Sequence, residues 1–224
     1  MQCWICGAEA VSREHTIKKS DLKSVYGDAS QSQPLFYSND KRKNLPVGSL
    51  KSHRFTSPAK ICKYCNDTRT QPHDRAWEQF SSAMRLTLRK PSFPESLRAN
   101  SIFQYDTHRM MLNIHLYFIK LFGCHIATEK IPIELAEFSY SIMNSKAHPN
   151  VYLGFWRIEQ RVGMSNVEAQ IAHNGDCAFA TWFYEIENLA INVMYASPGE
   201  KREGLVNAWH PRLATNKLVI HKLG

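Results

Sequence analysis

Residues 3–19 read CWICGAEAVSREHTIKK and residues 62–66 read CKYCN. Both stretches begin with two cysteines separated by two residues. In a reducing compartment such pairs ligate zinc more often than they form disulfides, and each pair supplies one knuckle of a zinc ribbon. A redox-active pair is the alternative interpretation. The cysteines predicted to hold one structural Zn²⁺ in a tetrahedral site are Cys3, Cys6, Cys62 and Cys65.

The segment between the two cysteine pairs is unusually long. Its 55 residues exceed the roughly 15 to 20 of a simple zinc ribbon. The segment is polar, and only residues 19–25 suggest a short helix, so we expect it to depend on the zinc ion for its fold. The other two cysteines, Cys124 and Cys177, lie in apolar surroundings, where we expect them to pack as small apolar side chains rather than act as nucleophiles.

The remainder of the chain has the patterns of both helices and strands. Apolar residues on one helical face predict a long helix that begins near Pro72 and ends before Pro91. After a candidate linker at 91–94, residues 107–122 predict a buried helix that ends at Gly123. A shorter helix is predicted at 133–143, strands at 151–158, 168–173, 178–187, 189–195 and 217–221, and a hairpin turn at 174–176.

These elements predict an α+β protein with two domains, a zinc-binding module at 1–91 and an α+β domain with an antiparallel sheet at 95–224. Residues 1–91 contain 16 Lys and Arg against 8 Asp and Glu, whereas the remainder contains 12 of each. The whole net charge of +8 therefore lies in the first module, as expected for a polyanion-binding unit. No apolar run approaches the roughly 20 residues of a membrane span, and no secretory signal is recognisable, so the expected location is the cytoplasm.

Glu14-His15-Thr16-Ile17, framed by the two cysteine pairs and followed by Asn66 directly after the last cysteine, resembles the HNH endonuclease family. These are ββα-metal nucleases, and the resemblance is to the subgroup with a four-cysteine zinc site. It covers roughly residues 1–90 and implies a ββα module with His15 as general base. It also implies that Glu14 and Asn66, with His73 as an additional ligand, bind a catalytic Mg²⁺ or Mn²⁺. The alternative for His73 is a helix-start residue that faces solvent.

The chemistry of these side chains agrees with the resemblance. Histidine has the side-chain pKa best suited to deprotonating water near neutral pH, and a divalent cation offsets the charge that develops on the phosphate. Neighbouring residues of an ideal strand face opposite sides, so the strand that carries Glu14 and His15 must be irregular if both line one site. The loop-pinning asparagine of the family has no obvious counterpart. Asn44 is our candidate for it, and His53 is the alternative.

The expected substrate follows from the basic charge and the family resemblance. Basic residues near the motifs are predicted to contact backbone phosphates with little sequence preference. HNH relatives mostly cut or nick double-stranded DNA, so DNA is the implied substrate, and RNA remains open. The residues predicted to bind nucleic acid are Lys18, Lys19, Arg69 and Arg75.

The second domain carries no comparable motif. Its aromatic residues either form a base-stacking platform or, as strand spacing favours, a core. Open roles for 95–224 are target choice, homodimerisation, or sensing of the kind found in phage-defence nucleases. Three hypotheses for the whole chain compete: a metal-dependent HNH endonuclease, a non-catalytic zinc-ribbon protein that binds nucleic acid, and a degenerate HNH scaffold for protein assembly. The presence of both Glu14 and His15 favours the first over the third.

Overall fold

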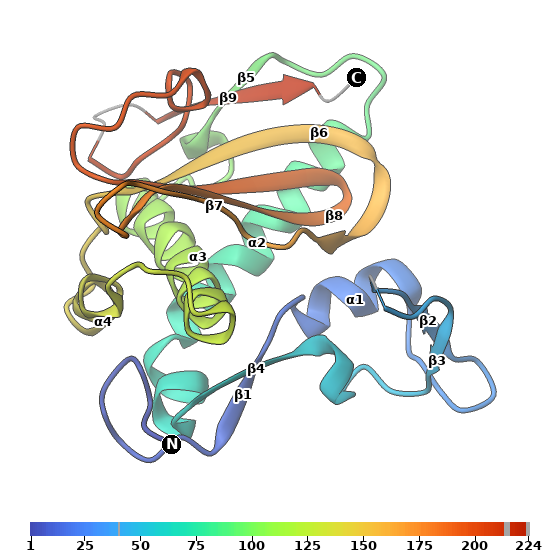
Figure 1. Ribbon diagram of the computed structural model, residues 1–224. Helices are drawn as coiled ribbons and strands as arrows, with labels where there is room; N and C mark the ends of the chain where they lie inside the picture. Colours follow the sequence, from blue (N-terminus) through green and yellow to red (C-terminus); the bar gives the residue numbers. More distant parts are fainter. Residues whose placement is uncertain (40, 213–215, 223–224) are drawn as a thin grey trace.

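The structure, a computed structural model, describes residues 1–39, 41–212 and 216–222. It is a mixed α+β fold, as the sequence predicted (Figure 1). A small antiparallel pair of strands lies near the N-terminus, and a five-stranded sheet is built from strands within residues 96–222. Two long helices run between them (Figure 1).

The small pair consists of β1 (Ser12–His15) and β4 (Thr56–Ile61). Ser12 lies opposite Ile61, but the register shifts between Arg13 and His15, so this strand has the expected irregularity. Alternation nevertheless persists, because Glu14 is buried and His15 is only half-buried. Between the strands lie α1 (Lys19–Tyr26), the hairpin of β2 (Leu35–Tyr37) and β3 (Leu45–Val47), and a 3-10 turn (His53–Phe55).

The predicted long helix is confirmed as α2 (Gln71–Leu88), which follows a π-helical turn at Cys65–Arg69. Pro72 lies in its first turn, where a missing backbone N–H costs no helical hydrogen bond. The apolar stripe of the helix is completely buried, and its members are Trp77, Phe80, Met84 and Leu88. Asp21 of α1 accepts hydrogen bonds from the Trp77 indole and the Tyr184 hydroxyl, which ties α1 to α2 and to the large sheet.

Helix α3 (Thr107–Glu129) is longer than predicted, and Gly123 lies inside it rather than at its end. An added Cβ at this glycine would collide with the indole ring of Trp4, so close packing with the first cysteine knuckle explains the residue better than helix termination does. By length and hydropathy alone, α3 is the one helix among the described residues that could cross a membrane. However, 78% of its apolar window is buried inside the protein, which is typical of a core helix.

This packing makes a testable prediction. Gly123→Ala should lower the free energy of unfolding by about 1–3 kcal/mol, because overpacking against a rigid indole outweighs the gain in helix propensity. In a Trp4→Ala background the same substitution should instead stabilise by up to about 1 kcal/mol, since the obstacle is gone. Urea unfolding of the four proteins in this double-mutant cycle measures the coupling. Equal effects in both backgrounds would contradict the Trp4 contact.

The large sheet has the order β5 (Ser96–Arg98), β9 (Lys217–Lys222), β6 (Val151–Met164), β8 (Cys177–Ala196), β7 (Glu168–Ile171). The predicted antiparallel pairing holds for β5–β9, β6–β8 and β7–β8, but β9 runs parallel to β6, so the sheet is mixed. The two strands predicted at 178–187 and 189–195 are one strand, β8, which bends at Glu187 with a positive φ of 54°. The turn at 174–176 is confirmed by the Ala172 N–H to Asp176 carbonyl bond of 2.8 Å.

The predicted short helix at 133–143 is confirmed as α4 (Leu135–Met143). Three of the aromatic side chains considered for base stacking, Trp182, Tyr184 and Trp209, are buried, so the core interpretation holds for them. One continuous apolar core includes residues from both 1–91 and 95–224, because α2 and α3 pack against each other and α3 packs against β4. The elements that carry Glu14 and His15 are therefore fixed against the second half of the chain.

Candidate metal centre and nucleic-acid interface

The four predicted cysteines come together at the base of the β1–β4 pair. Their sulfur atoms all lie within 4.8 Å of one another, and Cys6 Sγ is 3.5 Å from Cys62 Sγ. The first knuckle closes through the Gly7 N–H to Cys3 carbonyl bond of 2.8 Å, with Gly7 at a φ of +77°. Burial and the neighbouring cysteines raise the pKa of Cys65, so four thiolates here require a compensating cation. This donor set fits a structural metal ion such as Zn²⁺.

His15 projects from the end of β1 and is held by the segment between the two knuckles. Its Nε2 lies 3.3 Å from the backbone carbonyl oxygen of Leu50, whose side chain is buried. A carbonyl oxygen only accepts hydrogen bonds, so the contact favours the tautomer with the proton on Nε2. Nδ1 then carries the lone pair, and none of the described residues forms a hydrogen bond with it. This tautomer is the form that a general base requires.

Asn66 braces the same strand from the opposite side of the module. Its Nδ2 donates to Ser12 Oγ at 2.7 Å and to the Arg13 carbonyl at 3.4 Å. The residue directly after the last cysteine is therefore bonded to the strand that carries His15. The candidate for the loop-pinning asparagine, Asn44, lies instead near the β2–β3 turn, where its N–H donates to Ser38 Oγ at 3.0 Å.

Glu14 points in the opposite direction from His15, into the protein. Its Oε2 lies 3.0 Å from Nζ of Lys120, a completely buried residue of α3. The same ammonium lies 3.1 Å from Asp74 Oδ1 and 3.2 Å from Thr70 Oγ1. Burial lowers the pKa of Lys120, but Glu14 and Asp74 outweigh that effect and the pKa is raised. Sequence reasoning missed Lys120, for which the only signal was a charge within an apolar helix.

His73, the additional ligand suggested by the resemblance, is buried rather than facing solvent. Its Nδ1 lies 2.9 Å from Asn113 Oδ1, and its buried Nε2 has no partner among the described residues. Burial is the main reason that the pKa of His73 falls to about 4, so the ring is neutral at physiological pH. Its neighbour Asp74 is not the N-cap of α2, since that position belongs to Thr70.

The predicted ligands of the catalytic metal ion, Glu14, Asn66 and His73, do not form an open coordination site in the observed side-chain positions. Among the described residues, the four cysteines are the only group of three or more His, Cys, Asp or Glu side chains whose ligand atoms lie close enough together to share one metal ion. Glu14 is paired with Lys120, Asn66 donates to β1, and His73 is bonded to Asn113. Mg²⁺ requires several oxygen ligands in octahedral geometry, and this arrangement does not fit it.

The basic residues predicted to bind nucleic acid have different environments. Lys19 and Arg75 are exposed, and the guanidinium of Arg69 lies 5.2 Å from the centre of the Tyr64 ring. Lys18 is only 16% exposed and pairs with Asp74 at 3.3 Å, so it is less available to a phosphate.

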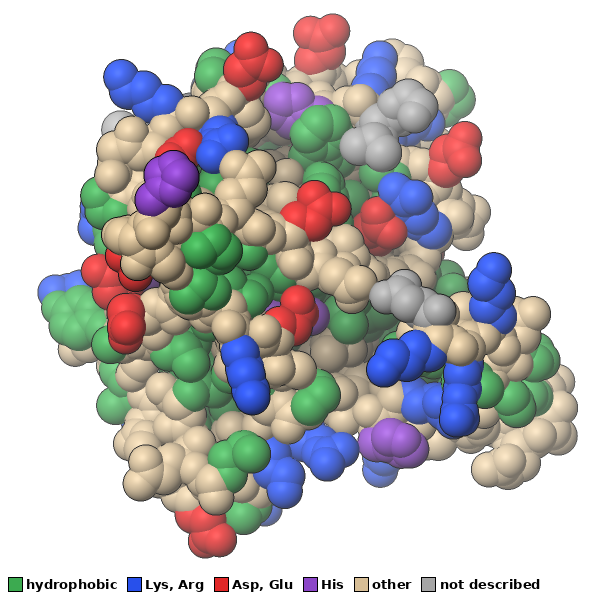
Figure 2. Space-filling model, in the orientation of Figure 1, with side chains coloured by type: hydrophobic (Ala, Val, Ile, Leu, Met, Phe, Trp, Pro, Cys, Tyr) green, Lys and Arg blue, Asp and Glu red, His purple; other side chains and the backbone are tan. Residues whose placement is uncertain are grey.

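Two further basic residues lie on the strand pair that carries His15. Arg13 is exposed on the same side of β1, and Lys60 lies opposite Arg13 on β4. The alternation of a strand was the signal that places Arg13 beside His15. More Lys and Arg side chains gather on the lobe formed by α1, β2 and β3 (Figure 2). The exposed ones in this segment are Lys19, Lys23, Lys41, Arg42, Lys43 and Lys51.

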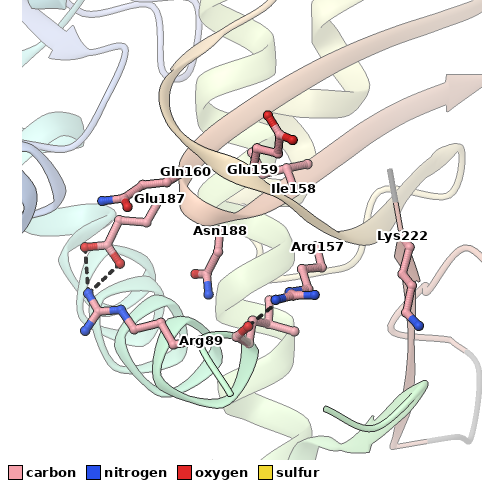
Figure 3. Close-up of a pocket in the computed structure, with 9 residues that line it drawn as sticks. Arg89, Arg157, Ile158, Glu159, Gln160, Glu187, Asn188 and Lys222 are labelled. Carbon is pink, nitrogen blue, oxygen red and sulfur yellow. Dashed lines mark hydrogen bonds and ion pairs between the residues drawn. The ribbon is translucent and has the colours of Figure 1, made fainter. Parts of the chain in front are cut away.

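A separate cavity of about 690 Å³ opens where the end of α2 meets the large sheet (Figure 3). Arg89 reaches across it to Glu187, with bonds of 2.8 and 2.6 Å to the two carboxylate oxygens. Arg157 Nε donates to the Leu88 carbonyl at 3.1 Å, and Lys222 Nζ lies 5.2 Å from the centre of a phenylalanine ring. These charged groups already have partners within the protein, so we assign no ligand to this cavity.

Three histidines that are scattered in the sequence, His115, His148 and His210, meet in the core. The His148 N–H donates to His115 Nε2 at 3.1 Å, and His210 Nε2 lies 2.8 Å from the His148 carbonyl. Burial is the main cause that lowers the pKa of all three, to about 3 for His148. Glu137 lies 3.6 Å from His148 Nε2, but its side chain is 55% exposed.

These histidines predict sensitivity to acid. Because their pKa values are lower in the folded than in the unfolded protein, the unfolded chain binds more protons below pH 6.5. Stability is therefore full well above pH 6.5 and is lost as the pH falls, with a slope that approaches about 1.4 kcal/mol per pH unit for His148 alone once the pH is well below 6.5. Urea unfolding between pH 7.5 and 5.5 should show the onset of this slope, a loss of about 1.4 kcal/mol over the two pH units for His148 alone. His148→Asn should reduce the slope, whereas His173→Gln, at an exposed position, should leave it unchanged; equal slopes would contradict the assignment.

Comparison of the chain with protein-family models, with curated proteins and with solved structures finds no significant match.

Proposed function

We propose that this protein is a nuclease of the HNH type that hydrolyses phosphodiester bonds of DNA with His15 as general base. The observation that carries the proposal is the hydrogen bond from His15 Nε2 to the Leu50 carbonyl, which leaves Nδ1 as the proton acceptor. The arrangement of an antiparallel strand pair, a helix that follows it and a four-cysteine cluster supports the proposal. Asn66 adds to this support because it braces the strand of His15.

The chemistry starts with a neutral His15. Nδ1 takes a proton from a water molecule as its oxygen attacks the phosphorus atom. The bond from phosphorus to the 3′ oxygen then breaks, and this leaving oxygen takes a proton from solvent. Arg13, with Lys60 opposite it, offers positive charge on the side of the β1–β4 pair where His15 lies. These cations bind backbone phosphates and offset the charge of the transition state.

A second candidate is a zinc-ribbon protein that binds DNA without cutting it. The ion pair between Glu14 and Lys120 favours this alternative, because an HNH nuclease would use Glu14 to hold a divalent ion. Both candidates use the basic lobe, so DNA binding alone does not separate them. They differ in whether Nδ1 of His15 accepts a proton from the attacking water molecule.

The test is a plasmid assay with the zinc-loaded protein in buffers containing Mg²⁺, Mn²⁺ or neither. Conversion of supercoiled DNA to nicked or linear forms supports the nuclease. A gel shift without any cleavage under all three conditions supports the binding protein and rejects the nuclease. A parallel assay on single-stranded RNA determines whether RNA is also a substrate.

A further inference from the structure

Lys120 is the most completely enclosed charge near the candidate site. Its side chain has no exposed surface, although a lysine is rarely buried without strong compensation. Three oxygens surround Nζ, from Glu14 at 3.0 Å, Asp74 at 3.1 Å and Thr70 at 3.2 Å. An ammonium group has three N–H donors, so the number of oxygens matches the number of donors.

All three oxygens come from the N-terminal module, whereas the ammonium comes from α3 in the other half of the chain. Carboxylate and hydroxyl oxygens are also what a hard divalent cation binds in proteins. Lys18 adds a second positive charge beside the two carboxylates, at 3.3 Å from Asp74 and 3.5 Å from the more exposed Glu78. Glu14 and Asp74 therefore face one buried and one shared lysine, which weakens their attraction for another cation.

We infer that Lys120 is the resident cation of the Glu14–Asp74 pair and takes the position that a divalent ion would otherwise occupy. A consequence is that His15 works without a divalent ion bound to Glu14. This consequence rests on the proposed nuclease function, whereas the cation assignment itself does not. The lysine also joins the two halves of the chain. Removing it would leave two carboxylates without their shared cation, and such a loss of one partner from a buried ion pair is strongly destabilising.

The test is to remove the ammonium and ask whether a metal ion replaces it. Lys120→Met keeps the length of the side chain but leaves Glu14 and Asp74 without their shared cation. In zinc-loaded protein we expect this variant to melt at lower temperature than the wild type. Mn²⁺ at about a hundredfold excess over its dissociation constant should then raise its melting temperature by about 5 °C or more. A role confined to packing would give no response to Mn²⁺.

Matched variants identify the ligands. Lys120→Met combined with Glu14→Gln should lose the Mn²⁺ response, because one of the two carboxylates is gone. Lys146→Met, a substitution of the same type at an exposed position, should melt like the wild type with or without Mn²⁺. A folded Lys120→Met protein that does not respond to Mn²⁺ would overturn the inference.

The wild type provides a second measurement that does not depend on the folding of a variant. Electron paramagnetic resonance of added Mn²⁺ should give the same amount of bound ion for the zinc-loaded wild type and for zinc-loaded Glu14→Gln. This is expected because Glu14 holds no Mn²⁺ in the wild type. A bound Mn²⁺ that disappears in Glu14→Gln would overturn the inference, even if Lys120→Met fails to fold. Neither measurement uses DNA cleavage, so failure of the proposed nuclease function would be seen separately.

Discussion

His15→Ala should reduce the rate of DNA cleavage by about 10²- to 10⁴-fold, the usual contribution of a general base. The side chain is only half-buried, and its one hydrogen bond in the described structure goes to the Leu50 carbonyl, so its removal should cost little stability. Cleavage of supercoiled plasmid under single-turnover conditions measures the rate, and a gel shift measures DNA binding. We expect binding to be unchanged within about twofold.

The matched control is His173→Ala, at an exposed position outside the segment framed by the cysteines. It should cleave at the wild-type rate, which would show that the loss in His15→Ala is specific to that residue. Added imidazole should partly restore cleavage to His15→Ala, because it supplies the missing proton acceptor without repairing the fold. Undiminished cleavage by His15→Ala would remove His15 from the mechanism.

Cys62→Ser should release the metal ion and unfold the N-terminal module. Binding of structural zinc contributes about 10–16 kcal/mol in zinc-finger peptides, more than the stability of most domains. The segment between the knuckles is mostly polar, and although Ile17, Leu22 and Phe55 join the shared apolar core, we expect the metal to make the larger contribution to its fold. Zinc content measured by native mass spectrometry should fall from one ion to none, and amide exchange should show loss of protection in β1 and β4.

Cys177→Ser is the control for the loss of a thiol. This cysteine is also buried, but it lies in β8 of the large sheet and outside the cysteine cluster. The variant should retain one zinc ion and the protection of β1 and β4. A Cys62→Ser protein that is zinc-free yet keeps these protected amides would show that apolar packing, and not the metal, holds the module.

Local patterns predicted the helices and the long strands of the large sheet, but they missed β2 and β3 in the segment between the knuckles. The stripe from Trp77 to Leu88 predicted α2, because helical periodicity is written directly in the spacing of apolar residues. The continuation of α3 through Gly123 was missed, because a glycine in a helix can mark a close contact as well as an end, and the contact here comes from the distant Trp4. The parallel pairing of β9 with β6 was also missed, because strand order depends on contacts between residues far apart in the chain.

The sequence by itself identified the four cysteines as one candidate metal site, since the paired spacing is typical of a metal knuckle in many different folds. It also placed Glu14 and His15 next to each other on a strand that turns them to opposite sides. Only the tertiary structure decided what each side chain meets, the Leu50 carbonyl for His15 and the Lys120 ammonium for Glu14. The physical reason is that a buried carboxylate requires a countercharge, and packing α3 against the N-terminal module brings that charge from a distant part of the sequence.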